Sequence, residues 1–164
     1  MAEQDSGRVK VAIVGSGPAG LSAAARAAVL GLSHVLIEKT GHLSDTIYKY
    51  QKGKHVMATP SNLVLRSDLD FDAGKREAIL ETWDRQIAAG KINVLLDAEV
   101  TAIAGEKGDF TIELKGREPV HAEAVVLAIG TQGNPNLLRI PARNCRISST
   151  SSTTPANITT STSR

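Results

Sequence analysis

A glycine motif between a strand-like run and a helix-like run constrains the fold of this chain more than any other feature. Val9–Val14 is a continuous, mostly β-branched segment of the kind that parallel sheets bury on both faces. It leads directly into Gly15-Ser-Gly-Pro-Ala-Gly20, and an alanine-rich helix is expected over Leu21–Leu30, with Gly31 at its end. His34–Glu38 is a second strand of the buried type. The segment therefore predicts a right-handed βαβ unit with a parallel strand pair.

The three glycines have the spacing Gly-x-Gly-x-x-Gly, and each has a physical role in binding a dinucleotide. Gly15 permits a tight turn, Gly17 lets the backbone approach a pyrophosphate, and Gly20 lets helix and strand pack closely. The helix N-terminus offers N–H groups and a partial positive charge to phosphates, and Pro18 suits its first turn. Glu38 follows Gly20 by 18 residues, where its carboxylate can accept hydrogen bonds from ribose hydroxyls and disfavours a 2′-phosphate. A dinucleotide site is predicted; a chance glycine turn in an α/β protein is the alternative.

The later part of the chain alternates apolar runs with glycine-containing turns. Asp72–Ala89 predicts a helix, because its apolar residues recur at helical spacing. Ile92–Leu96 is a short strand candidate, and Ala124–Ile129 predicts a last strand of the buried type. Three short segments between these two strands predict a small antiparallel meander: Ala98–Ala104, Phe110–Leu114 and Pro119–Ala122.

The composition is that of a globular domain and excludes several classes of protein. Hydrophobic residues make up 41% and charged residues 22% of the 164 residues, which excludes a wholly disordered chain. The net charge of +2 gives no long-range field to steer nucleic acid or an anionic membrane to the surface. Aromatic residues, at 3%, are too few for a platform on which single-stranded bases stack. We therefore expect neither nucleic acid nor a membrane among the partners.

The cysteine, histidine and N-terminal features favour a reduced, cytoplasmic protein without a metal. Cys145 is the single cysteine, which excludes an internal disulfide and a four-cysteine zinc site. The 4 histidines are scattered without the spacing of metal ligands. The N-terminus has no export signal, and the most apolar stretch, Leu21–Leu32, carries Arg26 and is too short to cross a bilayer.

Two later features distinguish FAD from NAD as the expected dinucleotide. A meander inserted before the last strand is not part of a plain NAD-binding Rossmann domain. The last strand ends in Ala128-Ile-Gly130, close to an Ala-Thr-Gly that leads towards the NAD(P)H domain in one flavoprotein family. With the glycine motif and Glu38, about residues 8–141 resemble the FAD domain of the pyridine nucleotide–disulfide oxidoreductases, thioredoxin reductase-like branch. The resemblance implies an α/β, Rossmann-like FAD-binding domain with a parallel sheet and an inserted antiparallel meander.

The resemblance also implies which residues would hold FAD, although it identifies no catalytic residue. Glu38 would bind the adenosine ribose, Lys39 would lie near the adenine, and the Val100 backbone would contact the adenine edge. Gly130 would close over the flavin side, and the loop at residues 44–47 is expected near the isoalloxazine by position. For Lys39 and the basic cluster at residues 48–54, a solvated surface is the interpretation that we favour over a binding role. The pyrophosphate would lie on Gly15, Ser16, Gly17, Pro18, Ala19 and Gly20.

Several parts of the family's machinery have no counterpart in these 164 residues. There is no Cys-x-x-Cys, so a relay from flavin to a disulfide cannot run. A second glycine fingerprint for NAD(P)H is missing, and so is the C-terminal glycine–aspartate segment that completes the FAD site. We therefore expect a truncated N-terminal FAD domain in which residues 1–141 form a partial Rossmann-like domain.

The composition changes abruptly after Pro141. Ser and Thr make up 12 of the 16 residues from Ser148 to Ser163, and such a segment cannot bury enough apolar surface to offset its ordering entropy. We expect a disordered tail over residues 142–164. We favour a shifted reading frame as its origin, because common codons for residues 141–146 re-read as Pro-Gly-Ala-Glu-Leu-Pro after loss of one C. A natural Ser/Thr tail is the alternative, and the gene sequence at the Pro141 codon distinguishes the two.

These observations favour the FAD-binding part of a flavin-dependent oxidoreductase. The full-length parent would pass hydride from NAD(P)H through FAD to an electron acceptor that the sequence does not identify, and a homodimeric parent is compatible with the resemblance. NAD(P)H would bind the full-length parent only. Two alternatives stay open: an inactive dinucleotide-binding fragment, and a regulatory βαβ binding module without turnover.

Overall fold

The N-terminal part folds as the predicted strand–helix–strand unit. β1 (Arg8–Val14), α1 (Pro18–Val29) and β2 (His34–Ile37) follow one another in the computed structural model, which describes residues 7–58 and 67–131. α1 begins at Pro18, earlier than the helix predicted from Leu21, because proline has a helical φ and its missing N–H costs nothing in the first turn. The expectations for Cys145 and for the tail at residues 142–164 lie outside the described residues.

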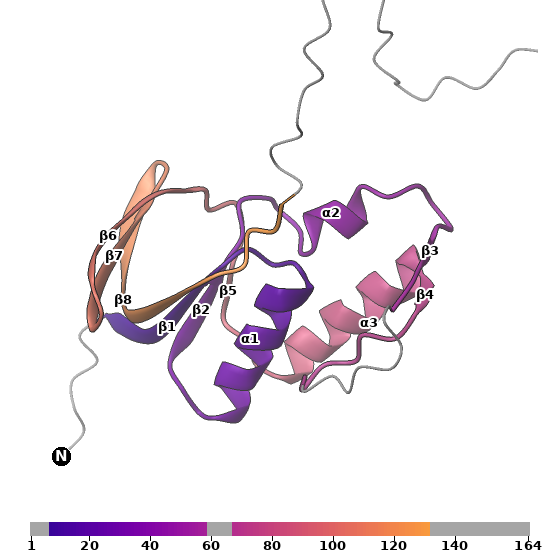
Figure 1. Cartoon of the computed structure of the whole chain (residues 1–164), viewed down its shortest axis with the longest axis horizontal. Helices are drawn as coiled ribbons and strands as arrows, with labels where there is room; N and C mark the ends of the chain where they lie inside the picture. Colours follow the sequence, from indigo (N-terminus) through magenta and orange to yellow (C-terminus); the bar gives the residue numbers. More distant parts are fainter. Residues whose placement is uncertain (1–6, 59–66, 132–164) are drawn as a thin grey trace, which may run out of the picture. The chain divides into compact units, whose positions relative to one another are not determined.

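Six strands form one sheet, and β1 and β8 lie in its middle. The strand order is β5-β2-β1-β8-β7-β6 (Figure 1). β1 pairs in parallel with β2 and β8, and β2 pairs in parallel with β5, whereas β7 pairs antiparallel with β6 and β8. The predicted α/β class, with a parallel sheet and an inserted antiparallel meander, is confirmed. The four further strands are β5 (Val94–Leu95), β6 (Val100–Glu106), β7 (Asp109–Leu114) and β8 (Arg117–Leu127).

The prediction of two separate strands after residue 117 was wrong, because β8 is a single strand. Its first half pairs antiparallel with β7 up to Ala122, and residues 121–127 pair in parallel with β1. One long strand thus serves both as the third meander strand and as a neighbour of β1. The burial predicted for Ala124–Ile129 was also wrong: Leu127, the last residue of β8, is 64% exposed, and Ile129 beyond it is 71% exposed. Within the described residues, the pairing of β8 with β7 does not extend past Ala122.

The segment between β2 and β5 contains one long helix and three short elements. α3 (Arg76–Ala89) covers most of the helix predicted over Asp72–Ala89, but it begins later, because residues 74–75 form a strand. The sequence did not predict the four-residue helix α2 (Asp45–Tyr48) or the antiparallel pair of β3 (His55–Val56) and β4 (Gly74–Lys75). Elements of two to four residues are too short to show a hydrophobic period.

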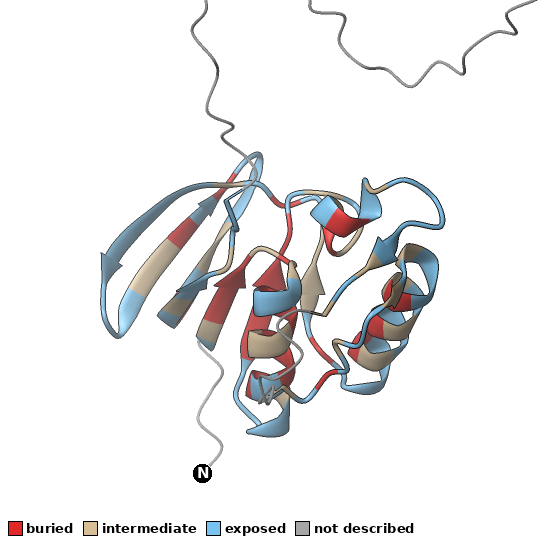
Figure 2. Ribbon diagram, turned by 45° about the vertical axis from the view of Figure 1, so that its right-hand side comes forward, coloured by how far each residue is buried: buried red, intermediate tan, exposed pale blue. Residues whose placement is uncertain are grey.

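The core lies on both faces of the sheet. On one face, Ile13 and Leu36 pack against apolar residues of α1 and α3, including Leu21 and Trp83. On the other face, residues of β1 and β2 pack together with residues of the meander, and the buried cluster there consists of Ala12, Val35, Ile37, Ala98, Ile112, Leu114 and Ala122. Figure 2 shows buried residues concentrated in the central strands and exposed residues along much of the meander. No helix in the described part of the chain is long and apolar enough to span a membrane.

Candidate functional site

The turn between β1 and α1 is shaped by close backbone packing at its first and last glycines. Gly15 has a φ of +100°, and a Cβ there would lie 2.6 Å from the carbonyl oxygen of Ala128. A Cβ at Gly20 would overlap the carbonyl oxygen of Gly15. Both positions therefore require glycine for the fold itself, since the atoms in the way belong to the backbone. Gly15 permits the turn and the approach of the chain after β8, and Gly20 lets α1 pack on the turn.

Gly17, the middle glycine, is different, because nothing in the described protein requires a glycine there. Its φ of −67° and ψ of 177° are open to any residue, and no heavy atom lies within 4 Å of an added Cβ. Gly17 is half-buried, and the following Pro18 and Ala19 are exposed. The space next to Gly17 fits the close approach of a pyrophosphate to the backbone, which is the role that the Gly-x-Gly-x-x-Gly spacing predicts.

The N-terminus of α1 is suited to an anion. The first intrahelical hydrogen bond runs from the Leu21 N–H to the Gly17 carbonyl oxygen at 2.9 Å, so the N–H groups before it have no partner within the helix. The first turn of α1 contains no acidic residue that would neutralise the positive end of the helix dipole. The exposed start of α1 and the open side of Gly17 thus form one surface for phosphate groups.

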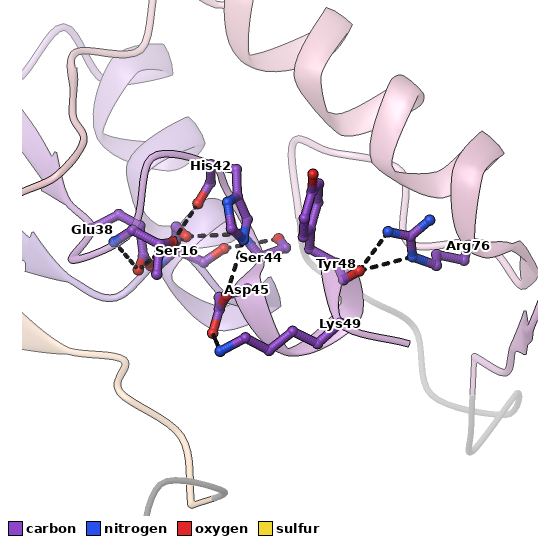
Figure 3. A network of polar contacts seen from close by, with 9 residues as sticks. Ser16, Glu38, His42, Ser44, Asp45, Tyr48, Lys49 and Arg76 are labelled. Carbon is purple, nitrogen blue, oxygen red and sulfur yellow. Dashed lines mark hydrogen bonds and ion pairs between the residues drawn. The ribbon is translucent and has the colours of Figure 1, made fainter. Parts of the chain in front are cut away.

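Glu38 follows β2, and its carboxylate is buried beside the glycine turn. The residue is 6% exposed and accepts four hydrogen bonds (Figure 3). Oε2 accepts from the Ser16 N–H at 3.0 Å and from the Ser16 hydroxyl at 2.6 Å. Oε1 accepts from the Thr40 N–H at 3.0 Å and from the Thr40 hydroxyl at 3.1 Å. Burial alone raises the pKa of Glu38, but these bonds outweigh it and hold the pKa below its usual value, so the group is a carboxylate.

Ser44, at the start of α2, forms two hydrogen bonds with Ser16 of the glycine turn. Its N–H donates to the Ser16 hydroxyl oxygen at 2.9 Å, and its own hydroxyl donates to the Ser16 carbonyl oxygen at 2.9 Å. Ser44 is 2% exposed and has a φ of +54°, a left-handed value that is uncommon outside glycine. The loop predicted to approach the flavin is therefore held against the fingerprint turn by two buried hydrogen bonds. Serine directly before Asp45 is a helix-start signal that could have located α2.

A polar network continues from α2 to α3 (Figure 3). His42 Nε2 lies 2.9 Å from Asp45 Oδ1, and Lys49 Nζ lies 2.7 Å from Asp45 Oδ2. The hydrogen bond from Lys49 is the main reason that the pKa of Asp45 lies below its usual value. The His42 ring stacks on the Tyr48 ring with centroids 3.8 Å apart, and Arg76 Nε of α3 donates to the Tyr48 carbonyl oxygen at 3.0 Å.

The structure also places Lys39 and Val100 near Glu38. The Ala98 N–H donates to the Glu38 carbonyl oxygen at 2.9 Å, which aligns the segment leading into β6 with the residues after β2. Lys39 is exposed and contributes to lowering the pKa of Glu99, after the larger effects of the Lys115 ion pair. Val100, half-buried, begins β6. The fold thus gathers the residues predicted for the adenosine end around the end of β2.

Gly130 lies on the other side of β1. The Ala128 N–H donates to the Val14 carbonyl oxygen at 2.8 Å, which brings the chain after β8 beside the glycine turn. Gly130 is exposed and has a φ of +65°, and nothing lies within 4 Å of an added Cβ. Nine of the ten predicted residues therefore follow the carboxyl ends of parallel strands, where open α/β sheets bind ligands, and the tenth, Val100, begins the antiparallel strand β6.

The described residues offer no metal site at this edge of the sheet, and two cavities of the protein lie elsewhere. They contain no group of three His, Cys, Asp or Glu side chains that could hold a metal ion. One cavity of about 310 Å³ lies between α1 and α3, lined by residues such as Ala25 and Ala89, and one of about 370 Å³ is lined by Arg8 and His34. Neither of these two cavities includes the glycine turn.

Comparison with known proteins identifies the family. The chain matches the pyridine nucleotide-disulphide oxidoreductase family over residues 12–161 and belongs to it. This is a family of FAD-binding oxidoreductases that use pyridine nucleotides. The resemblance inferred from the sequence is thus confirmed.

Curated relatives include two bacterial ferredoxin–NADP reductases. The one from Acidiphilium cryptum is 34% identical over 120 residues, covering 73% of this chain and 33% of the relative. The one from Gluconacetobacter diazotrophicus is 32% identical with the same coverage. The chain therefore spans about a third of the length of the curated relatives that it matches.

Solved structures show the same fold at low sequence identity. A bacillithiol disulfide reductase from Staphylococcus aureus superimposes with a TM-score of 0.69 at 24% identity, covering 81% of this chain and 42% of that one. A ferredoxin–flavin thioredoxin reductase from Clostridium acetobutylicum gives a TM-score of 0.59 at 23% identity, covering 79% and 40%.

Proposed function

We propose that this chain binds FAD on the surface formed by the glycine turn, the start of α1 and Glu38. The observation that carries the proposal is the contrast among the glycines. Gly15 and Gly20 are required by the protein's own backbone, whereas Gly17 faces open space that a ligand would fill. A buried carboxylate at the end of the neighbouring strand supplies acceptors for ribose hydroxyls.

Different residues of the site would bind different parts of FAD. The turn at residues 15–20 would hold the pyrophosphate through backbone N–H groups, and Glu38 would orient the adenosine ribose. Lys39 and the Val100 backbone would border the adenine, and Gly130 would face the flavin side. When bound, FAD supplies the capacity to accept and donate hydride, and the protein contributes position and electrostatics.

For the longer protein, we propose an oxidoreductase in which FAD would take hydride from NAD(P)H and pass its two electrons on to an acceptor, with release of the proton. Membership of the pyridine nucleotide-disulphide oxidoreductase family supports it. The ferredoxin–NADP reductases among the relatives favour ferredoxin as the electron acceptor.

A flavin titration tests the proposal. The purified 164-residue chain is titrated with FAD, and binding is followed by quenching of flavin fluorescence, with NAD as a competitor. We expect saturable binding of FAD that NAD does not displace at equal concentration. Glu38→Ala should weaken FAD binding by about 1–3 kcal/mol, since it removes charge-assisted hydrogen bonds. Uptake of NAD in preference to FAD would overturn the assignment.

An assay of NAD(P)H consumption by the FAD-loaded chain then separates the alternatives. Turnover with an artificial acceptor would support an enzyme, whereas FAD binding without turnover would support the binding fragment. A chain that binds neither FAD nor NAD would support a βαβ module with a different role.

A further inference from the structure

The carboxylate proposed to bind ribose has no acceptor position to spare. A carboxylate offers about four lone-pair sites. The N–H and hydroxyl groups of Ser16 and Thr40 lie within hydrogen-bond distance of all of them, between 2.6 and 3.1 Å. It is also 6% exposed, so there is little room for water to add to this set. A ribose hydroxyl can therefore bond to Glu38 well only if one of the four donors gives way.

Three of the four donors are held in place. The N–H groups of Ser16 and Thr40 belong to the backbone and cannot turn. The Ser16 hydroxyl donates to Glu38 Oε2 at 2.6 Å and accepts from the Ser44 N–H at 2.9 Å. Within the described residues, its proton has no other acceptor than Glu38. Turning the Ser16 hydroxyl away would thus leave a buried proton unpaired, at a cost that a ligand would have to offset.

The Thr40 hydroxyl is the exception, because its one proton has two acceptors. Its oxygen lies 3.1 Å from Glu38 Oε1 and 2.9 Å from the carbonyl oxygen of His42. It can leave Glu38 and keep a hydrogen bond. Thr40 is also half-buried, whereas Ser16 is 1% exposed, so Oε1 is the oxygen nearer to solvent-accessible atoms.

We propose that the Thr40 hydroxyl occupies, in the ligand-free protein, the position on Glu38 Oε1 that a ribose hydroxyl takes, and that it turns to the His42 carbonyl oxygen when the ligand binds. Thr40 is then a positioning residue that competes with the ribose, and Ser16 is the fixed donor that keeps Glu38 oriented. This inference rests on the proposed function, because it concerns the ribose end of the same site.

The proposal predicts opposite effects at the two hydroxyls. Thr40→Val keeps the shape of the side chain but removes the competitor. Without FAD, the substitution removes a hydrogen bond to the charged Glu38 oxygen. With FAD bound, it removes only the hydrogen bond to the neutral His42 carbonyl oxygen, which is the weaker of the two. FAD and ADP should therefore bind about three- to tenfold more tightly to Thr40→Val. Ser16→Ala should bind them about tenfold more weakly, because Glu38 loses a fixed donor.

The experiment is calorimetric titration of the full chain with FAD, ADP and 2′,3′-dideoxy-ADP. The dideoxy probe keeps the adenine and the pyrophosphate but has no ribose hydroxyl to exchange. We expect Thr40→Val to bind FAD and ADP more tightly than the wild type does. Its affinity for the dideoxy probe should stay within about twofold of the wild-type value. Thr40→Ser should restore the wild-type affinities for FAD and ADP. Thr40→Ala serves as the second removal variant if the valine variant melts at a lower temperature than the titration allows.

The outcomes test the proposed function separately from the exchange, by which we mean the turn of the Thr40 hydroxyl from Glu38 to His42. If the wild type binds FAD but Thr40→Val binds it no more tightly, the exchange is wrong and the FAD site stands. If Thr40→Val increases the affinity for the dideoxy probe as much as the affinity for ADP, the effect does not depend on the ribose hydroxyls, and the exchange is again wrong. If the wild type binds neither FAD nor ADP, the proposed function is wrong, and the exchange fails with it.

Discussion

The carboxyl ends of β1 and β8 lie side by side in the sheet, yet their surroundings differ. After β1, the buried polar residues Ser16, Glu38 and Ser44 bond to one another. At the end of β8, the apolar side chains of Leu127 and of Ile129 just beyond it are more than half exposed. The first region is organised by hydrogen bonds among its own residues, whereas the second contributes little buried surface in the described part of the chain. Substitutions should therefore act strongly in the first region and weakly in the second.

Within the first region, the largest effect is expected at Gly20. In Gly20→Ala, the new Cβ would overlap the Gly15 carbonyl oxygen, and neither backbone can move without opening the turn. We expect a loss of about 3 kcal/mol in the free energy of unfolding, measured by urea denaturation. Gly17→Ala is the matched control, because no atom lies within 4 Å of its Cβ. It should change stability by about 0.5 kcal/mol. Equal losses in the two variants would contradict the steric account.

Glu38 should make the stability of the first region depend on pH. Its pKa in the folded protein lies below the reference value of 4.5, because the hydrogen bonds to the carboxylate outweigh the cost of burial. Its contribution is therefore fully present above about pH 4.5 and is lost as the pH falls from there through the lowered pKa. Glu38→Gln should cost about 2 kcal/mol at neutral pH and flatten the decline below pH 4.5. A melting temperature of the wild type that does not fall in this range would argue against a buried, bonded carboxylate.

Ser44 should have a moderate effect. Ser44→Ala removes the hydroxyl that donates to the Ser16 carbonyl oxygen inside a buried contact. We expect a loss of about 1 kcal/mol in the free energy of unfolding, since one buried acceptor loses its partner. Thr46→Ala, an exposed position on the same short helix, is the control and should be nearly neutral. Thermal melts of the two variants compare them, and a larger loss at Thr46 would place the anchor of α2 elsewhere.

The smallest effect is expected at the end of β8. Leu127→Ser should change the free energy of unfolding by no more than about 0.5 kcal/mol, because the side chain is 64% exposed. Ile112→Ala, at a fully buried site of the meander, should cost about 2–5 kcal/mol. Urea denaturation of both variants gives the contrast directly. A costly Leu127→Ser would mean that the end of β8 is covered in solution.

Features that depend on neighbouring residues were predictable from the sequence. The βαβ unit, the glycine turn and Glu38 follow from hydrophobic runs, glycine spacing and a carboxylate at a strand end. The family resemblance, drawn from the same residues and the meander, is also confirmed. The cofactor-binding roles of individual residues stay predictions, as do the division at residue 141 and the shifted frame.

Features that depend on distant contacts were not predictable. Ser16 and Ser44 are 28 residues apart in sequence, and no local pattern joins them. The two acceptors of the Thr40 hydroxyl emerge only once the loop after β2 is folded. The β8 strand was divided wrongly, because a strand that changes partners shows two short patterns in place of one. Its apolar residues suggested burial. Burial depends on which other segments pack against the strand, and the strand's own sequence does not show this.

The most direct test of the central claim is the FAD affinity of Gly17→Ala compared with the wild type. The added Cβ fits the ligand-free protein but stands where a pyrophosphate would meet the backbone. The account predicts that Gly17→Ala keeps the wild-type stability and binds FAD about 100-fold more weakly. A variant that binds FAD as tightly as the wild type would show that the cofactor does not lie on this turn.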